Sequence, residues 1–189
     1  MKTEVPSFPA VRQKARAVCA AQERVADRFS RHFVPAMRIE IDDPARPDVC
    51  ALLEEHLRDM YALSPPESVH ALDVDGLKRP EVTFWTVRNG DLLLGCGALK
   101  ELDPTHGEIK SMRTPATLRR MGAGRALLAH LVAEARRRGY RRLSLETGSM
   151  VTFAAAQRLY ESVGFVPCEP FGEYRSDPYS LFMTLSLGD

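Results

Sequence analysis

The chain is poor in cysteine and has no long hydrophobic run. Its 189 residues include four cysteines, and no two of them form a Cys-x-x-Cys pair. This spacing predicts neither a zinc site nor a disulfide framework and is typical of buried free thiols in a reducing compartment. No apolar run reaches membrane-spanning length, and the first residues lack the apolar core of a signal peptide. We therefore expect a cytoplasmic protein with no membrane partner and no bound metal.

The chain also lacks a large net charge. Its formal charge is +1 at pH 7, whereas a dedicated nucleic-acid-binding domain is strongly basic. The basic character is local, because ten residues between Lys110 and Arg142 are Lys or Arg and one, Glu134, is acidic. The length and the hydrophobic content of 44% suit one globular domain with a full core. We therefore do not expect a nucleic-acid partner.

The first 36 residues read as a separate segment. Pro6 and Pro9 make its beginning irregular, and a loose stripe of apolar residues among basic ones predicts an amphipathic helix between Val11 and Phe33. Such a helix commonly packs on its own domain or on a dimer mate, and a membrane surface or nucleic acid is the alternative. We divide the chain into an N-terminal extension, residues 1–36, and a domain, residues 37–189.

Periodicity and turn signals predict an antiparallel front half followed by a crossover unit. Asn89-Gly90 is a strong hairpin signal between two strand-like runs. A strand, a glycine turn, a helix and another strand then follow in the order that a parallel pair requires. Ser68 is predicted to cap a short helix that ends near Leu77. The class is therefore mixed α/β. The expected strands are Met37–Ile41, Val82–Arg88, Asp91–Leu99, Glu108–Arg113, one around Leu143–Thr147, Phe165–Cys168 and Ser180–Leu187, and the expected helices are Pro47–Tyr61, one from the glycine turn to Gly139, and Thr152–Val163.

The glycine turn has the chemistry of an anion site. A helix begins at Gly122 and Gly124, and a helix N-terminus carries unpaired N–H groups and a partial positive charge. Glycine lets phosphate oxygens approach the backbone, and neighbouring arginines add charge-assisted donors. No Lys-Ser/Thr follows, which excludes a Walker loop, and the dinucleotide fingerprint needs a third glycine. The alternative is a tight strand-to-helix turn with a solvated basic face.

Two motifs together resemble those of a known family. Arg119-x-x-Gly122-x-Gly124, after a strand and at the start of an amphipathic helix, resembles motif A of the GNAT superfamily of N-acetyltransferases. Residues 156–165, AQRLYESVGF, are similar to motif B, and the two motifs follow in the family's order. The resemblance covers residues 37–187 and is greatest for small bacterial YsnE-like proteins. It implies a mixed, largely antiparallel sheet with a splayed parallel pair, helices on both faces, acetyl-CoA as co-substrate and no metal. Homodimers are common in the superfamily.

The resemblance also implies how the donor is held. The glycine turn and its arginines would contact the pyrophosphate of CoA, and the pantetheine arm would lie beside Ile109–Arg113. A backbone N–H near Met112 would donate to the thioester carbonyl. One position departs from motif B, because Phe153 stands where the family often has Asn, and this makes the pocket more apolar. The implied cofactor-binding residues are Met112, Arg113, Arg119, Arg120, Met121, Gly122, Ala123, Gly124, Arg125 and Ala156.

Acetyl transfer to an amine needs a base and an acid. An alkylammonium has a pKa of about 10.4, so little free amine exists at pH 7. Glu108 is the candidate base, at the offset before the glycine turn where histone-acetylating relatives carry theirs, and Glu146 or an ordered water is the alternative. Tyr160 matches the motif B tyrosine and is the candidate acid for the departing thiolate. The competing interpretations are a Glu108 carboxylate paired with Lys110 or Arg113 and a Tyr160 that only packs in the core.

The acceptor is less readable from the sequence. In the superfamily, the segment between the first two helices lies over the acceptor site, and a capped, solvated turn is the alternative for residues 64–70. We expect a small-molecule primary amine, amino-acid-like, as acceptor. Two other functions compete: a GNAT-fold protein that binds acyl-CoA without turnover, and a nucleic-acid binder that uses the basic helix, against which the near-zero net charge weighs. The candidate substrate contacts are Glu67, His70, Glu146 and Tyr174.

Overall fold

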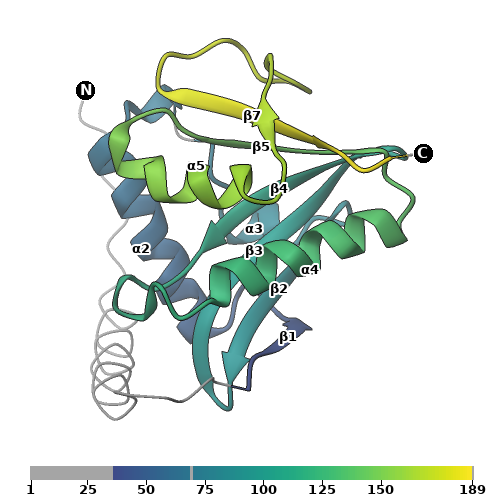
Figure 1. The fold of residues 1–189 in the computed structure, drawn as a ribbon. Helices are drawn as coiled ribbons and strands as arrows, with labels where there is room; N and C mark the ends of the chain where they lie inside the picture. Colours follow the sequence, from purple (N-terminus) through teal and green to yellow (C-terminus); the bar gives the residue numbers. More distant parts are fainter. Residues whose placement is uncertain (1–35, 69, 189) are drawn as a thin grey trace.

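The computed structural model describes residues 36–68 and 70–188, so the predicted N-terminal helix lies outside the described residues. Seven strands form one mixed sheet in the order β1-β2-β3-β4-β5-β7-β6 (Figure 1). In this part of the chain, no helix is long and apolar enough to span a membrane. The elements are β1 (Arg38–Ile41), α2 (Pro47–Leu63), η2 (Pro66–Ser68), α3 (Val74–Leu77), β2 (Val82–Asn89), β3 (Leu92–Asp103), β4 (His106–Arg113), η3 (Ala116–Leu118), α4 (Ala123–Arg137), β5 (Arg142–Gly148), η4 (Val151–Phe153), α5 (Ala154–Glu161), β6 (Val166–Pro167) and β7 (Ser180–Ser186).

Strands β4 and β5 are the parallel pair in an otherwise antiparallel sheet. Their pairing runs from His106 opposite Arg142 to Ile109 opposite Leu145 and then stops, although both strands continue. Beyond this point β4 still pairs with β3, and β5 still pairs with β7. The two strands therefore diverge in the middle of the sheet, and the predicted splayed parallel pair is confirmed.

A β-bulge in β4 lies where the two strands part. Ser111 and Met112 of β4 face the single residue Gly97 of β3, and Ser111 has a left-handed φ of 49°. A Cβ at Gly97 would lie 3.1 Å from Leu127 Cδ2, a tight contact that the Leu127 side chain would have to relieve by shifting, and 3.5 Å from Met112 Cα. A bulge bends its own strand, so this one turns β4 away from β5.

Helices cover both faces of the sheet, as predicted. Helices α4 and α5 pack on one face (Figure 1), in a core cluster that contains Trp85 and Leu127. Helices α2 and α3 pack on the other face, in a second cluster that contains Phe84, Val49 and Leu77. Phe84 and Trp85 enter opposite clusters because successive side chains of a strand point to opposite faces.

Most element boundaries lie within two residues of the predicted ones, and two features differ by more. Helix α3 is capped by Asp73, whose carboxylate accepts a hydrogen bond from Gly76 N at 2.7 Å. The sequence predicts Ser68 as the cap, but Ser68 ends the separate turn η2. Strand β3 extends beyond the predicted end at Leu99 because Lys100 still pairs with β4.

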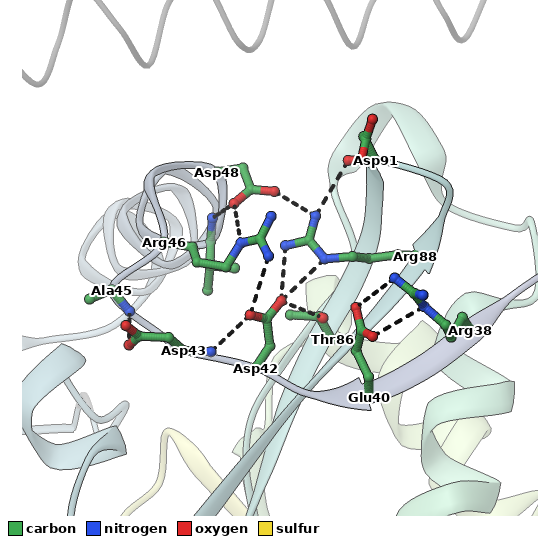
Figure 2. A network of polar contacts seen from close by, with 11 residues as sticks. Arg38, Glu40, Asp42, Asp43, Ala45, Arg46, Asp48, Thr86, Arg88 and Asp91 are labelled. Atoms are coloured by element: carbon green, nitrogen blue, oxygen red, sulfur yellow. Dashed lines mark hydrogen bonds and ion pairs between the residues drawn. The ribbon is translucent and has the colours of Figure 1, made fainter.

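A buried arginine joins β1, α2 and β2. Arg88 is 2% exposed and donates from Nη1 to Asp48 Oδ2 at 2.7 Å and from Nη2 to Asp42 Oδ2 at 3.1 Å (Figure 2). Thr86 Oγ1 donates to the same Asp42 oxygen at 2.8 Å. Burial alone would raise the pKa of Asp42, but the hydrogen bonds from Thr86, from the Asp43 N–H and from Arg88 outweigh it and lower the pKa. We call Asp42, Asp48, Thr86 and Arg88 the arginine network.

Candidate active site

A cavity of about 1000 Å³ lies between the diverging ends of β4 and β5. We call it the first cavity. Its wall comprises Ile109–Arg113, Glu146–Gly148, the first turn of α4 and parts of α2 and α5. The predicted cofactor-binding residues line this cavity with one exception, Met121, which packs against the core cluster under α4. The fold thus brings motif A, motif B and the β4 strand to one space.

The first turn of α4 leaves backbone donors open. Gly122 precedes the helix with φ of 89°, Arg120 has φ of 67°, and no side chain caps the helix. The first N–H groups of a helix have no partner within it. At Gly124, a Cβ would lie 3.6 Å from both Leu159 and Thr114, which is ordinary contact. The protein's own packing therefore does not require glycine at 124, whereas a ligand close to the backbone would.

The arginines of the first cavity fall into two kinds. Arg119, Arg120 and Arg125 are exposed and line it beside the helix terminus. Arg113 is half-buried and donates from Nη2 to Glu55 Oε1 at 2.8 Å and to Asp59 Oδ2, both on α2. The charge of Arg113 is thus already matched, and its ion pairs fasten α2 to β4.

Three buried polar atoms in the wall of this cavity have no hydrogen-bond partner among the described residues. They are Ser111 Oγ at the bulge, His56 Nδ1 on α2 and Arg113 Nε on β4. Burial and then the charge of Arg113 lower the pKa of His56 to about 4, so its ring is neutral at pH 7. Buried polar groups normally have partners, and a polar ligand in the first cavity would supply them.

Tyr160 packs in the core and also faces the site, so it combines the two roles that the sequence left open. It is 7% exposed, packs edge-on against Phe165 and also lines the first cavity. Burial and then the nearby Glu146 raise the pKa of Tyr160 to about 12. Its hydroxyl therefore keeps its proton at physiological pH and can donate it.

Phe153, the residue that departs from motif B, packs against Gly148, where a side chain is absent. A Cβ at Gly148 would lie 2.3 Å from Phe153 Cδ2, which no structure could accept. Gln157 Nε2 donates to Gly148 O at 2.8 Å from the next turn of α5. The ring lines the first cavity, so this part of its wall is apolar.

A second cavity, of about 1060 Å³, lies on the other side of β4. Its wall comprises Glu108 and Lys110 of β4, the end of β3 and the loop 171–179. The two cavities share a short stretch of wall, so they lie next to each other there. The shared residues are Ser68, His70, Lys110 and Tyr179.

Three polar side chains form a compact group at this junction. Lys110 Nζ donates to Tyr174 Oη at 2.5 Å and to His70 O at 3.0 Å, and it lies 3.2 Å from Glu108 Oε1. Tyr174 Oη donates to Glu108 Oε1 at 2.5 Å. Burial and then Glu108 raise the pKa of Tyr174. Glu108 therefore pairs with Lys110 rather than with Arg113, and it lines the second cavity. We call Glu108, Lys110 and Tyr174 the lysine bridge.

The other candidate substrate contacts are distributed over both cavities. Glu146 lines the first cavity, and Ser180 Oγ donates to its Oε1 at 2.7 Å. Burial raises the pKa of Glu146 although Ser180, Lys110 and His70 act in the opposite direction. The side chain of Glu67 lies outside the described residues.

Sequence reasoning missed Lys110 and Ser111 as members of the site. Lys110 stands two residues after Glu108 on one strand, so the two side chains share a face. Ser111 is signalled only indirectly, by Gly97 on the neighbouring strand. Among residues 36–68 and 70–188, no group of His, Cys, Asp or Glu could hold a metal ion.

Comparison with known proteins places this geometry in a family. Residues 49–165 match the model of the Acetyltransferase (GNAT) family. The chain is 56% identical over 151 residues to an uncharacterized N-acetyltransferase of Bacillus subtilis, YsnE, covering 80% of this chain and 100% of that protein. It is 50% identical over 149 residues to an uncharacterized N-acetyltransferase of Escherichia coli, YedL (79% and 94% covered). It is 38% identical over 155 residues to a protein of Azospirillum brasilense named IAA acetyltransferase (82% and 100% covered).

Solved structures share the fold. A crystal structure assigned as an acyl-CoA N-acyltransferase of Klebsiella pneumoniae matches with a TM-score of 0.64 and 28% identity, over 80% of this chain and 98% of that one. A structure from Salmonella typhimurium that contains acetyl-CoA matches with a TM-score of 0.57 and 22% identity, over 82% and 95%. Since the family model spans more than half of the chain and the relatives cover most of it, the chain belongs to the GNAT family of acetyltransferases, with YsnE among its relatives.

Proposed function

We propose that this enzyme transfers the acetyl group of acetyl-CoA to a primary amine of a small molecule. The observation that carries the proposal is that the two cavities adjoin at His70 and Lys110. The first cavity contains the open helix terminus and suits an anionic donor, and the second is lined by charged and aromatic side chains and suits a polar acceptor. A thioester at the junction would be open to attack from the second cavity.

The donor contacts follow from the chemistry of the first cavity. The N–H groups at Ala123 and Gly124 and the exposed arginines would hold the pyrophosphate. The free edge of β4 beyond Ile109 would run beside the pantetheine arm, and a main-chain N–H near Met112 would polarise the thioester carbonyl. When bound, acetyl-CoA supplies an activated acetyl group and a thiolate leaving group. The unpaired Ser111 Oγ and the lack of any packing need for Gly124 support this fit.

The proton transfers fall to three residues. Tyr160, still protonated at neutral pH, would donate to the departing sulfur. Glu108, the base that the family resemblance implies, and Glu146, the alternative, lie on opposite sides of the junction. Either carboxylate is positioned to receive the proton of the acceptor's ammonium group, directly or through water.

The lining of the second cavity favours an acceptor that carries both charges. Cationic and anionic side chains without a described ion pair occur together there, which is the pattern that a zwitterion needs. We therefore expect amino-acid-like amines, which are zwitterions, to be better acceptors than amines without a carboxylate. These side chains are Arg79, Lys100, Arg175, Glu81, Glu101, Glu173 and Asp177.

An amine panel tests the proposed reaction. With acetyl-CoA and n-butylamine, putrescine, lysine or phenylalanine, we expect at least one amine to raise thiol release about tenfold or more over hydrolysis, because the junction brings amine and thioester together. Release is measured with a thiol-reactive chromophore, and the acetylated product by mass spectrometry. If CoA binds but none of these amines accelerates release, the non-catalytic acyl-CoA-binding function takes the place of the proposed one.

Gly124→Ala should separate ligand binding from folding. The added methyl meets only ordinary contacts in the protein, so stability should be unchanged or higher by up to about 1 kcal/mol. The methyl would stand between the backbone and the pyrophosphate, and CoA affinity should fall on the order of tenfold or more. Urea unfolding and calorimetric titration with CoA measure the two effects.

Gly139→Ala, at the other end of α4, is the matched control. Gly139 has φ of 79° and open space around its Cβ position, so alanine there should cost about 1 kcal/mol of stability. It should leave CoA affinity unchanged. If Gly124→Ala binds CoA as tightly as the wild type does, the pyrophosphate does not bind at this turn.

A further inference from the structure

The two carboxylates at the junction have different surroundings. Glu108 lines the second cavity and belongs to the lysine bridge, whereas Glu146 lines the first cavity and accepts one hydrogen bond, from Ser180. Building on the proposed function, we propose that they have different tasks. Glu108, fixed by Lys110 and Tyr174, docks the acceptor's ammonium group, and Glu146 removes its proton.

Strand register places both carboxylates on one face of the sheet. Ile109 and Leu145 are paired and enter the core cluster under α4. Side chains alternate along a strand, so Glu108 and Glu146 point to the opposite face. Glu108 lies just before the point where the strands part, and Glu146 just after it. An ammonium group at the junction would therefore meet Glu108 first on its way from the second cavity.

The hydrogen bonds of the lysine bridge have a fixed direction. An ammonium group only donates, so Lys110 donates to Tyr174 Oη, and the single hydroxyl proton of Tyr174 goes to Glu108. Lys110 Nζ donates hydrogen bonds to Tyr174 and His70, and its charge is paired with that of Glu108. Lys110 is therefore a positioning residue and not a free cation for the acceptor. Both contacts to Glu108 are made to Oε1, so among the described residues Oε2 remains available to an ammonium group.

Glu146 has the properties of a general base. Burial is the largest influence on it and disfavours its charge, which raises its pKa; the charged or titratable groups that face it are Lys110, His70, Glu108 and Tyr160. A carboxylate with a raised pKa accepts a proton more readily than an ordinary one. Two carboxylates whose surroundings differ in this way commonly divide the tasks of a reaction.

The protons and bonds of the proposed transfer balance. Glu146 takes one proton from the ammonium group, and the nitrogen lone pair attacks the thioester carbon. The C–N bond forms and the C–S bond breaks, while the Tyr160 proton passes to the sulfur. A second proton from the nitrogen restores Tyr160, and the proton on Glu146 leaves to solvent. The products are an N-acetylated amine and CoA thiol.

The two tasks leave different kinetic signatures. With the amine of highest rate in the panel, Glu146→Gln should lower kcat about a hundredfold, keep the amine KM within about threefold and abolish the fall of kcat toward low pH. That fall exists in the wild type because Glu146 must be ionised to accept a proton. Glu108→Gln should instead raise the amine KM about tenfold or more and keep the fall toward low pH.

Tyr174→Phe keeps every charge of the lysine bridge and guards against misfolding of Glu108→Gln, which leaves Lys110 unpaired. It should raise the amine KM about three- to tenfold, the loss of one hydrogen bond to a charged group. Glu134→Gln, on α4 and outside both cavities, should change neither constant. CoA titration of each variant reports its folding.

The outcomes are distinct. If Glu108→Gln abolishes the fall of kcat toward low pH, or Glu146→Gln changes only the amine KM, the division of tasks is wrong although the enzyme is active. If Tyr174→Phe leaves the amine KM unchanged, the lysine bridge does not position Glu108. If the wild type releases no thiol with any amine, the proposed function fails, and this inference fails with it.

Discussion

Replacing Tyr160 by Phe should lower kcat about a thousandfold while CoA affinity changes less than about threefold. The hydroxyl lines the first cavity, and its pKa of about 12 keeps it protonated where the enzyme works. Without it, the thiolate must leave as an anion, because the phenylalanine ring has no proton to donate. The ring itself remains, so packing against Phe165 and the shape of the cavity are preserved. Steady-state kinetics with the best amine and calorimetric titration with CoA give the two numbers.

Tyr140→Phe is the control for this substitution. Tyr140 is buried in the same core cluster and donates to Glu101 Oε2 at 2.8 Å, but it does not line the first cavity. It should lose stability by about 1 kcal/mol with little change in kcat. A Tyr160→Phe variant with wild-type kcat would show that the thiolate leaves without this acid.

Replacing Arg88 by Met should lower the free energy of unfolding by about 3 kcal/mol or more, because two partly buried aspartates lose their cation. The arginine network lines neither cavity, so CoA affinity and kcat per folded molecule should stay within about twofold. Urea unfolding measures the loss. Arg38→Met is the control, since the Arg38 side chain is 69% exposed in its pair with Glu40, and it should change stability by less than about 0.5 kcal/mol.

The arginine network also predicts a pH dependence. Burial would raise the pKa values of Asp42 and Asp48, but hydrogen bonds outweigh it. Asp42 accepts them from Thr86, the backbone and Arg88, and Asp48 accepts one from Arg88. The nearby arginine charges add to this effect, so both pKa values are lowered. Groups with a lowered folded-state pKa stabilise above their unfolded value of about 3.9 and lose that contribution as pH falls through the folded value. The difference in unfolding free energy between wild type and Arg88→Met should therefore shrink below about pH 4. A difference that grows there would assign the cost to packing instead of charge.

Much of the fold was predictable because its signals are local. Asn89-Gly90 marks the β2–β3 hairpin, and Gly139 and Gly164, both with positive φ, end their helices as expected. The parallel crossover followed from the order of elements alone. The bulge at Ser111 could not be placed, because it depends on how β3 and β4 pair in the folded sheet.

The candidate site was predictable where a motif carries it and not where distant residues meet. Gly122 and Gly124 indicate the anion site because the motif lies within a few consecutive residues. Lys110 and Tyr174 are 64 positions apart, and Arg88 lies 46 positions from Asp42. No periodicity or spacing links such pairs, since their partnership depends on how the 171–179 loop and α2 fold back onto the sheet.

The divergence of β4 and β5 has a consequence for how the protein behaves among other chains. Past Ile109 and Leu145, main-chain donors and acceptors face a gap instead of a neighbouring strand. On the rim of a sheet, such groups recruit strands of other molecules and seed aggregates. Here the unpaired main-chain groups are enclosed by α2, α4 and α5, so only a narrow, extended molecule can reach them. We expect deletion of Ser111 to remove the extra residue of the bulge, so that β4 pairs with β5 beyond Ile109 and the first cavity becomes narrower.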